Sequence, residues 1–152
     1  MLKKYELLQD HNSTLYYAGH KLTRIRALKS FGAVQVGQLG GYIEAEMNLS
    51  HYGDAWVADK ACVYGKACVH DNAIISGNAC LFGNADLYGN AKMSGKARAY
   101  DRARIFGNVV LTDSAEVFED AMISGNVRLC ALASVSGNKT LSKSEIVTKR
   151  IM

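Results

Sequence analysis

Apolar side chains recur at a fixed spacing through residues 52–141, where one six-residue unit is repeated fifteen times without a gap. The first copy begins at Tyr52 and ends at Val57, and its residues define positions one to six. Position six is apolar in every copy, and position four is alanine in twelve. Because these positions are two residues apart, they share one face of an extended strand, and the pattern predicts that both point inward.

The other positions predict corners between short strands. Position two is glycine in nine copies and acidic in five, and position three is often Asn or Asp. Such residues tolerate positive φ, so we expect it at positions two and three. A period of six with short strands and Gly/Asn corners is typical of a β-solenoid.

Position one shows that the full period is eighteen residues. It is small in every third copy, and the copies between are aromatic or His until Ser124. Three copies therefore make one coil of triangular cross-section, and fifteen copies predict five coils, roughly 24 Å long at the spacing of paired strands. Two aromatic columns are expected to fix the register or, alternatively, to form a ligand platform. They are Tyr64, Phe82, Tyr100 and Phe118, and Tyr52, His70, Tyr88 and Phe106.

The segments on either side of the array are expected to cap it. Residues 1–39 predict a small β cap with strands at 3–8, 15–17 and 21–28, although 21–30 also permits a helix. The β-helix is expected over 40–141, with Ile43 and Leu49 at position four of two degenerate copies. Residues 142–152 are expected to form a capping tail, as a short strand or helix over the last coil.

Composition places the chain among soluble single-domain proteins. Of its 152 residues, 49% are hydrophobic and 21% are charged. No apolar run approaches the ~20 residues of a membrane helix, and no signal core follows the N-terminus. The four cysteines match no zinc or redox spacing, so we expect free thiols, a cytoplasmic protein, and neither metal nor cofactor.

Basic residues form two clusters in a chain of net charge +4. Arg24 and Arg26 lie in an acid-free stretch, and a second group surrounds Tyr100. Together they predict a site for a small anionic ligand, but they are too few to indicate duplex nucleic acid. The alternative is a cross-coil charge ladder, because Arg98 and Glu116 are eighteen residues apart, as are Asp86 and Arg104. The second group comprises Lys92, Lys96, Arg98, Arg102 and Arg104.

Position five should face outward, yet it is apolar in the first five copies. An exposed apolar patch indicates an interface. Either the N-terminal segment folds over it or a second subunit does, and we expect a homo-oligomer, with a trimer favoured. The residues are Trp56, Cys62, Cys68, Ile74 and Cys80.

The stretch Val63–Ala67 resembles the hexapeptide-repeat left-handed β-helix family, although its glycine falls one place late. The resemblance implies a left-handed coil. It also implies acyl-CoA-dependent acyl transfer with a catalytic histidine, for which His51 and His70 are weak candidates without an acidic partner at a defined spacing. Carbonic anhydrases of this fold need three converging His ligands, and the array contains only His70.

A second resemblance covers nearly the whole chain. The stretches Arg24–Leu28, Gly37–Glu44 and Asn48–Ser50, followed by the Gly-Asn-Ala repeats, look like a group of phage and prophage proteins. We therefore expect a non-enzymatic accessory protein that binds a nucleotide-type anion or a host protein. Acyl transfer and a structural role in an assembly are the alternatives.

Overall fold

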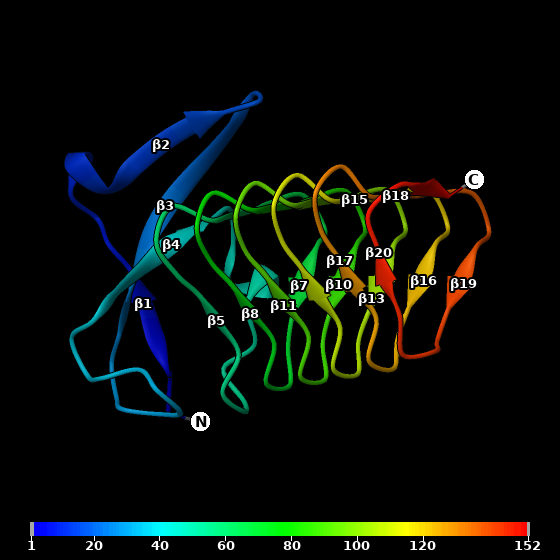
Figure 1. Cartoon of the computed structure of the whole chain (residues 1–152). Helices are drawn as coiled ribbons and strands as arrows, with labels where there is room; N and C mark the ends of the chain where they lie inside the picture. Colours follow the sequence, from blue (N-terminus) through cyan, green and yellow to red (C-terminus); the bar gives the residue numbers. More distant parts are fainter. Residues whose placement is uncertain (1, 152) are drawn as a thin grey trace.

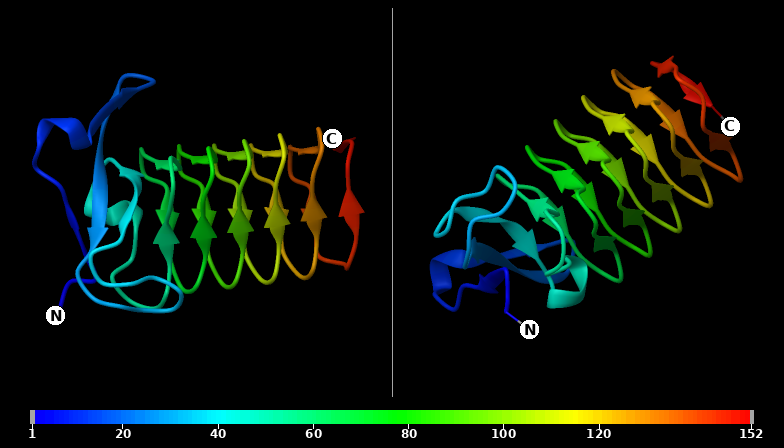
Figure 2. Two further views of the ribbon diagram at one scale, coloured as in Figure 1. Left: turned by 60° about the vertical axis from the view of Figure 1, so that its left-hand side comes forward. Right: turned by 90° about the horizontal axis from the view of Figure 1, so that it is seen from below.

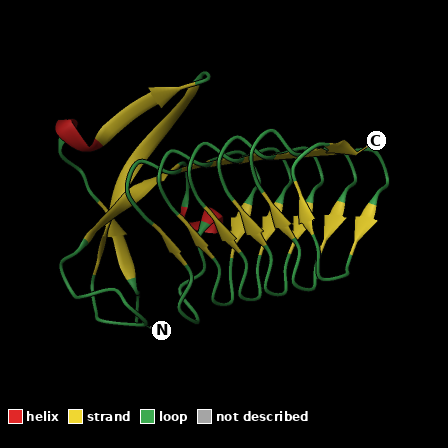
Figure 3. Ribbon diagram, viewed as in Figure 1, coloured by secondary structure: helices red, strands yellow, loops and turns green. Residues whose placement is uncertain are grey.

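A parallel β-solenoid forms the body of the protein, and the computed structural model describes residues 2–151 (Figure 1). Short strands stack into three flat sheets joined by corners, as Figure 2 shows from two further directions. No α-helix occurs within residues 2–151, and the two helical turns in Figure 3 are the 3-10 turns η1 (His11–Ser13) and η2 (Glu46–Asn48). The all-β prediction is confirmed.

Each sheet takes every third strand of the shaft. The first sheet contains β1 (Tyr5–Leu7), β2 (Thr14–Tyr17), β3 (His20–Ala27), β4 (Leu39–Ile43), β6 (Cys62–Val63), β9 (Cys80–Leu81), β12 (Arg98–Ala99), β15 (Glu116–Val117), β18 (Ser134–Val135) and β21 (Arg150–Ile151). The second sheet contains β7 (Cys68–Val69), β10 (Asp86–Leu87), β13 (Arg104–Ile105), β16 (Met122–Ile123) and β19 (Thr140–Leu141). The third sheet contains β5 (Trp56–Val57), β8 (Ile74–Ile75), β11 (Lys92–Met93), β14 (Val110–Leu111), β17 (Arg128–Leu129) and β20 (Ile146–Val147).

The eighteen-residue period and the inward positions are confirmed. Asp86 pairs in parallel with Arg104, and Arg98 pairs with Glu116. Position four is fully buried from Ala55 to Ala133, except for Val127 at 1%, and position six is fully buried from Val57 to Val135. The core is therefore a single column of small and branched apolar side chains along the shaft axis.

The corners depend on position two, where all fifteen residues have positive φ. Position three has none within residues 2–151, so that part of the prediction is wrong. The acidic residues at position two use their side chains. The Asp101 carboxylate accepts a hydrogen bond from the Glu119 backbone N–H at 2.9 Å, and Asp59 accepts one from Gly77 at 3.0 Å. Each acid thus joins its corner to the corner of the next coil.

The aromatic columns stack as predicted, except at Tyr52. Ring centroids are 5.0 Å apart for Tyr64 and Phe82, and 4.8 Å apart for His70 and Tyr88, with nearly parallel planes. Such pairs contribute about 0.5–1.5 kcal/mol each beyond area burial. Tyr52, expected on His70, is instead 71% exposed.

A two-residue insertion displaces Tyr52. Leu49 bridges Val69, twenty residues later (69 − 49), whereas Trp56 pairs with Ile74, eighteen residues later (74 − 56). The two extra residues therefore lie between Leu49 and Trp56, and we call residues 50–55 the insertion corner. Consequently Ile43, which pairs with Val63, and Leu49 occupy position six, and their assignment to position four is wrong.

Both ends extend the sheets. β1, β2 and β3 are antiparallel strands joined to the shaft through β4, so the expected strands are confirmed and the helix over 21–30 is wrong. Residues 142–151, expected as a short capping strand or helix, contain the strands β20 and β21, which pair with β17 and β18. The solenoid therefore has about six turns rather than the five predicted.

We expect Gly89→Ala to destabilise the protein more than Gly137→Ala. Both glycines have nearly the same φ, +66° and +68°, and positive φ costs a residue with a Cβ about 1 kcal/mol. At Gly89 the added Cβ would also lie 2.8 Å from the backbone N of Gly107, whereas nothing lies within 4 Å at Gly137. This crowding should add about 1–3 kcal/mol to the loss of unfolding free energy in urea. Equal losses would show that corner stacking is not tight.

Candidate functional site

A cavity of about 380 Å³ opens beside η2 at the N-terminal end of the second sheet. Its lining comes from η2, the insertion corner and the outer faces of β7 and β10, and includes Met47, Tyr52, Cys68, His70 and Asp86. Met47 and Tyr52 are 55% and 71% exposed at its rim, and Tyr52 belongs to the insertion corner. The shaft is therefore hollowed where its repeat is irregular.

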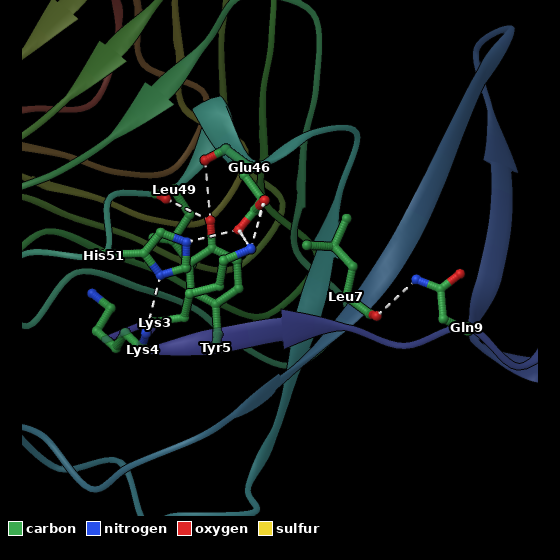
Figure 4. A network of polar contacts seen from close by, with 8 residues as sticks. All are labelled: Lys3, Lys4, Tyr5, Leu7, Gln9, Glu46, Leu49 and His51. Carbon is green, nitrogen blue, oxygen red and sulfur yellow. Dashed lines mark hydrogen bonds and ion pairs between the residues drawn. The ribbon is translucent and has the colours of Figure 1, made fainter. Parts of the chain in front are cut away.

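His51, one of the two histidine candidates, lines this cavity, and one stacking contact and two hydrogen bonds fix its ring (Figure 4). Its ring stacks on Tyr5, with centroids 4.1 Å apart. Its Nδ1 accepts a hydrogen bond from the Lys4 backbone N–H at 3.0 Å, so the proton resides on Nε2, which lies 2.9 Å from Glu46 Oε1. Both ring nitrogens are engaged, which argues against a general-base role.

The network around His51 supports the insertion corner and was not predicted. The Tyr5 hydroxyl donates to the Leu49 carbonyl at 2.6 Å, and burial raises the Tyr5 pKa. Lys4 is fully buried, and its Nζ donates to the carbonyls of Ala55 at 2.7 Å and Gly53 at 3.3 Å. Hydrogen bonds from His51 and Lys3 lower the Glu46 pKa. These residues lie outside the repeat pattern, and no signal in the sequence distinguishes them.

His70, the other histidine candidate, lines the same cavity. Its ring stacks on Tyr88, and its Nδ1 lies 3.8 Å from Asp71 Oδ1 with the side chain 40% exposed. Within residues 2–151, its Nε2 makes no hydrogen bond. The structure therefore brings both histidines to one cavity but leaves only His70 able to exchange a proton with a ligand.

The basic group around Tyr100 is divided among the faces of the shaft. The Arg98 guanidinium lies 5.4 Å from the ring centroids of both Phe82 and Tyr100, on the first sheet. Its Nη1 is 3.9 Å from Glu116, whose carboxylate also accepts a 3.0 Å hydrogen bond from the Tyr100 hydroxyl. Arg104 lies on the second sheet and Lys92 on the third, so the group does not converge on one point.

Other members of the two basic clusters have protein partners. Arg102 pairs with Asp120, one coil further along. Of the two predicted ladder pairs, Arg98 and Glu116 form a long ion pair, whereas Asp86 and Arg104 form none among residues 2–151. Arg26 binds Glu6, with 2.6 Å between Nη2 and Oε2. Arg24 donates to the Gly40 carbonyl at 3.0 Å and lies four strands away from Arg98 along the first sheet, roughly 19 Å at the usual strand spacing. Lys96 is exposed at a corner.

The N-terminal segment covers part of the apolar outer patch. Trp56, Cys62 and Cys80 are buried, and Phe31 meets Trp56 edge to face at 5.4 Å. Leu22 on β3 packs against the two cysteines. The patch was predicted to be covered either by the N-terminal segment or by a second subunit. For these three residues, the N-terminal segment provides the cover. Cys68 and Ile74 remain half-buried.

A hydrogen-bonded side-chain contact fixes the β2–β3 hairpin to the start of the shaft. His20 Nδ1 lies 2.9 Å from Glu44 Oε2, and the other Glu44 oxygen accepts a hydrogen bond from the Gly65 N–H at 2.8 Å. Both hydrogen bonds lower the Glu44 pKa, and the one with His20 has the larger effect. The hairpin is thereby tied to the corner between β6 and β7.

No protein-family model matches the sequence, and no curated protein matches it. Residues 2–151 contain no helix long and apolar enough to cross a membrane. The same residues contain no group of three or more His, Cys, Asp or Glu side chains placed to hold a metal ion.

The buried amine of Lys4 should make stability depend on pH. Burial lowers the Lys4 pKa from 10.5 to about 8. Between these values the unfolded chain binds a proton that the folded protein has lost, so this group's contribution to the unfolding free energy rises with pH. We expect the difference between wild type and Lys4→Met in urea unfolding to grow in favour of wild type from pH 8 to pH 10. Lys66→Met controls for the loss of a positive charge, and a constant Lys4 difference would contradict the assignment.

Proposed function

We propose that the protein is a non-enzymatic binding protein and that its ligand occupies the cavity beside η2. The observation that carries the proposal is an apolar hollow of about 380 Å³ with exposed Met47 and Tyr52 at its rim. Small-molecule sites are typically cavities of about 300–1,000 Å³ lined by apolar and aromatic groups with a few polar ones. A ligand here would also bury the exposed rim side chains.

The engaged nitrogens of His51 favour binding over acyl transfer. A general base needs a free nitrogen within reach of the proton that it removes. Since His51 donates and accepts within the protein, the acyltransferase alternative depends on His70 alone. Loss of acyl-CoA-dependent turnover in His70→Ala would support that alternative.

Arg98 favours a second candidate function, the binding of a nucleotide-type anion on the first sheet. Its guanidinium lies over two stacked rings, and its contact with Glu116 is long, at 3.9 Å. A guanidinium beside aromatic faces is suited to phosphate and base recognition. The Tyr100 hydroxyl holds Glu116 at 3.0 Å, so a bound phosphate would have to displace that carboxylate from Arg98.

The wider setting of the proposal comes from the resemblances in the sequence. We propose a left-handed coil of the hexapeptide-repeat type, a phage or prophage accessory role in the host cytoplasm, and a homotrimer, with a host protein or an assembly as the alternative partner. Cys68 and Ile74, half-buried on neighbouring sheets, are the members of the predicted patch that the N-terminal segment leaves for subunit contact. Native mass spectrometry of the purified protein would report the oligomeric state, and a monomeric mass would contradict the proposed trimer.

We expect Cys68→Phe to abolish binding of small neutral aromatic molecules. Cys68 lies on the cavity wall, so a phenyl ring there would fill the space. Indole is the probe, and saturation-transfer NMR should show its contact with wild type and its loss in the variant. Val110→Phe is the matched control, because Val110 has the same repeat position on the third sheet. Equal indole signals in all three proteins would overturn the cavity as the binding site.

We expect Arg98→Ala to weaken nucleotide binding at least tenfold if the second candidate is correct, because a charge-assisted phosphate contact contributes about 1.5–3 kcal/mol. Calorimetric titration with a panel of linear and cyclic nucleotides measures this effect. Arg128→Ala, an exposed arginine on the third sheet, is the control. A panel without any binding, or equal affinities in both variants, would remove the anion site.

A further inference from the structure

Two opposite charges lie side by side where the cavity opens onto the second sheet. Asp86 on β10 lines the cavity, and Arg104 on β13 is its parallel register partner on the next strand, about 4.8 Å away along the sheet. Asp86 is half-buried and Arg104 is exposed. Among the ion pairs of residues 2–151, none includes either side chain, so both charges remain available to a ligand.

Asp86 is the dominant uncompensated charge of the cavity. The other carboxylate on the lining, Glu46, lies 3.1 Å from the Lys3 ammonium and is hydrogen-bonded to His51. Both ring nitrogens of His51 are likewise engaged within the protein. Asp86 is also the register partner of Cys68 on the cavity wall, and the Cys68 pKa is raised, first by burial and then by the charge of Asp86.

The chemistry of this region changes along the shaft axis in a fixed order. The apolar hollow beside Met47 and Tyr52 comes first, Asp86 follows at its edge, and Arg104 lies one strand beyond. A simple cation would be attracted by Asp86 and repelled by Arg104, and a simple anion would meet the reverse. A molecule that carries both charges next to each other, with an apolar body, matches all three features.

We propose that the cavity binds a free α-amino acid with an apolar, preferably aromatic, side chain. The side chain enters the hollow, the ammonium group binds Asp86, and the carboxylate binds the Arg104 guanidinium. This inference depends on the proposed function, since it assigns a ligand class to the same cavity. The aromatic body lies against the rings of Tyr52 and His70, both of which line the hollow.

Three matched compounds test the assignment by calorimetry on the full chain. Phenylalanine carries both charges, phenethylamine only the ammonium, and 3-phenylpropionate only the carboxylate. We expect phenylalanine to bind at least ten times more tightly than either analogue. Equal affinities would overturn the zwitterion while leaving the cavity as a site. Binding of indole without binding of phenylalanine would also overturn it, and failure of both probes would remove the proposed function itself.

Two charge-removing variants test the individual contacts. Asp86→Asn should weaken phenylalanine and phenethylamine about tenfold and leave 3-phenylpropionate unchanged, whereas Arg104→Gln should weaken phenylalanine and 3-phenylpropionate and leave phenethylamine unchanged. Arg128→Gln, at the same repeat position on the third sheet, is the matched control and should alter none of the three. Variants that affect all ligands equally, with unchanged circular dichroism, would show that the two charges do not select between them.

Discussion

The interaction on which the structure depends is the hydrogen bond between the backbones of successive coils. The Cys80 N–H donates to the Ala97 carbonyl at 3.0 Å, and the Phe82 N–H donates to the Ala99 carbonyl at 3.1 Å, and this pattern continues along the shaft. Parallel pairing of this kind satisfies groups that would otherwise be buried without partners. It also fixes the register, because a slip of one residue would turn every inward side chain outward. Positive φ at position two follows from the same constraint, since each coil must turn sharply three times to return beneath itself.

Much of the shaft could be predicted from the sequence because each feature is repeated. The inward alanines, the eighteen-residue period and the stacked rings each recur in several copies, so no single residue decides the assignment. The insertion before Trp56 was missed for a physical reason. A shift of two residues converts position four into position six, and both positions point inward, so Ile43 and Leu49 satisfy either register. The predicted number of coils was lower than the observed number because β20 and β21 continue the sheets without the Gly-Asn corners of the repeat.

The candidate site was only partly accessible to the same reasoning. His51 and His70 were identified as chemically capable residues, but their meeting at one cavity depends on the insertion corner. The residues that hold His51 come from the other end of the N-terminal segment. Lys4 and Tyr5 contact residues 41 to 51 positions away, and no periodic pattern signals contacts of that kind. For the basic residues, the sequence showed that charges are close along the chain, whereas the triangular cross-section directs Arg98, Arg104 and Lys92 to three different faces.

The cavity lies at the irregular corner, whereas the length of the shaft comes from the regular coils. The length of the shaft and the structure of the cavity can therefore change independently. An added coil of eighteen residues would insert one strand into each sheet and lengthen the shaft by about 4.8 Å. Such a duplication far from η2 would leave the insertion corner, Asp86 and Arg104 unchanged. A change in the number of coils would therefore alter the length of the shaft without altering the corner that forms the cavity, and substitutions at that corner would leave the length unchanged.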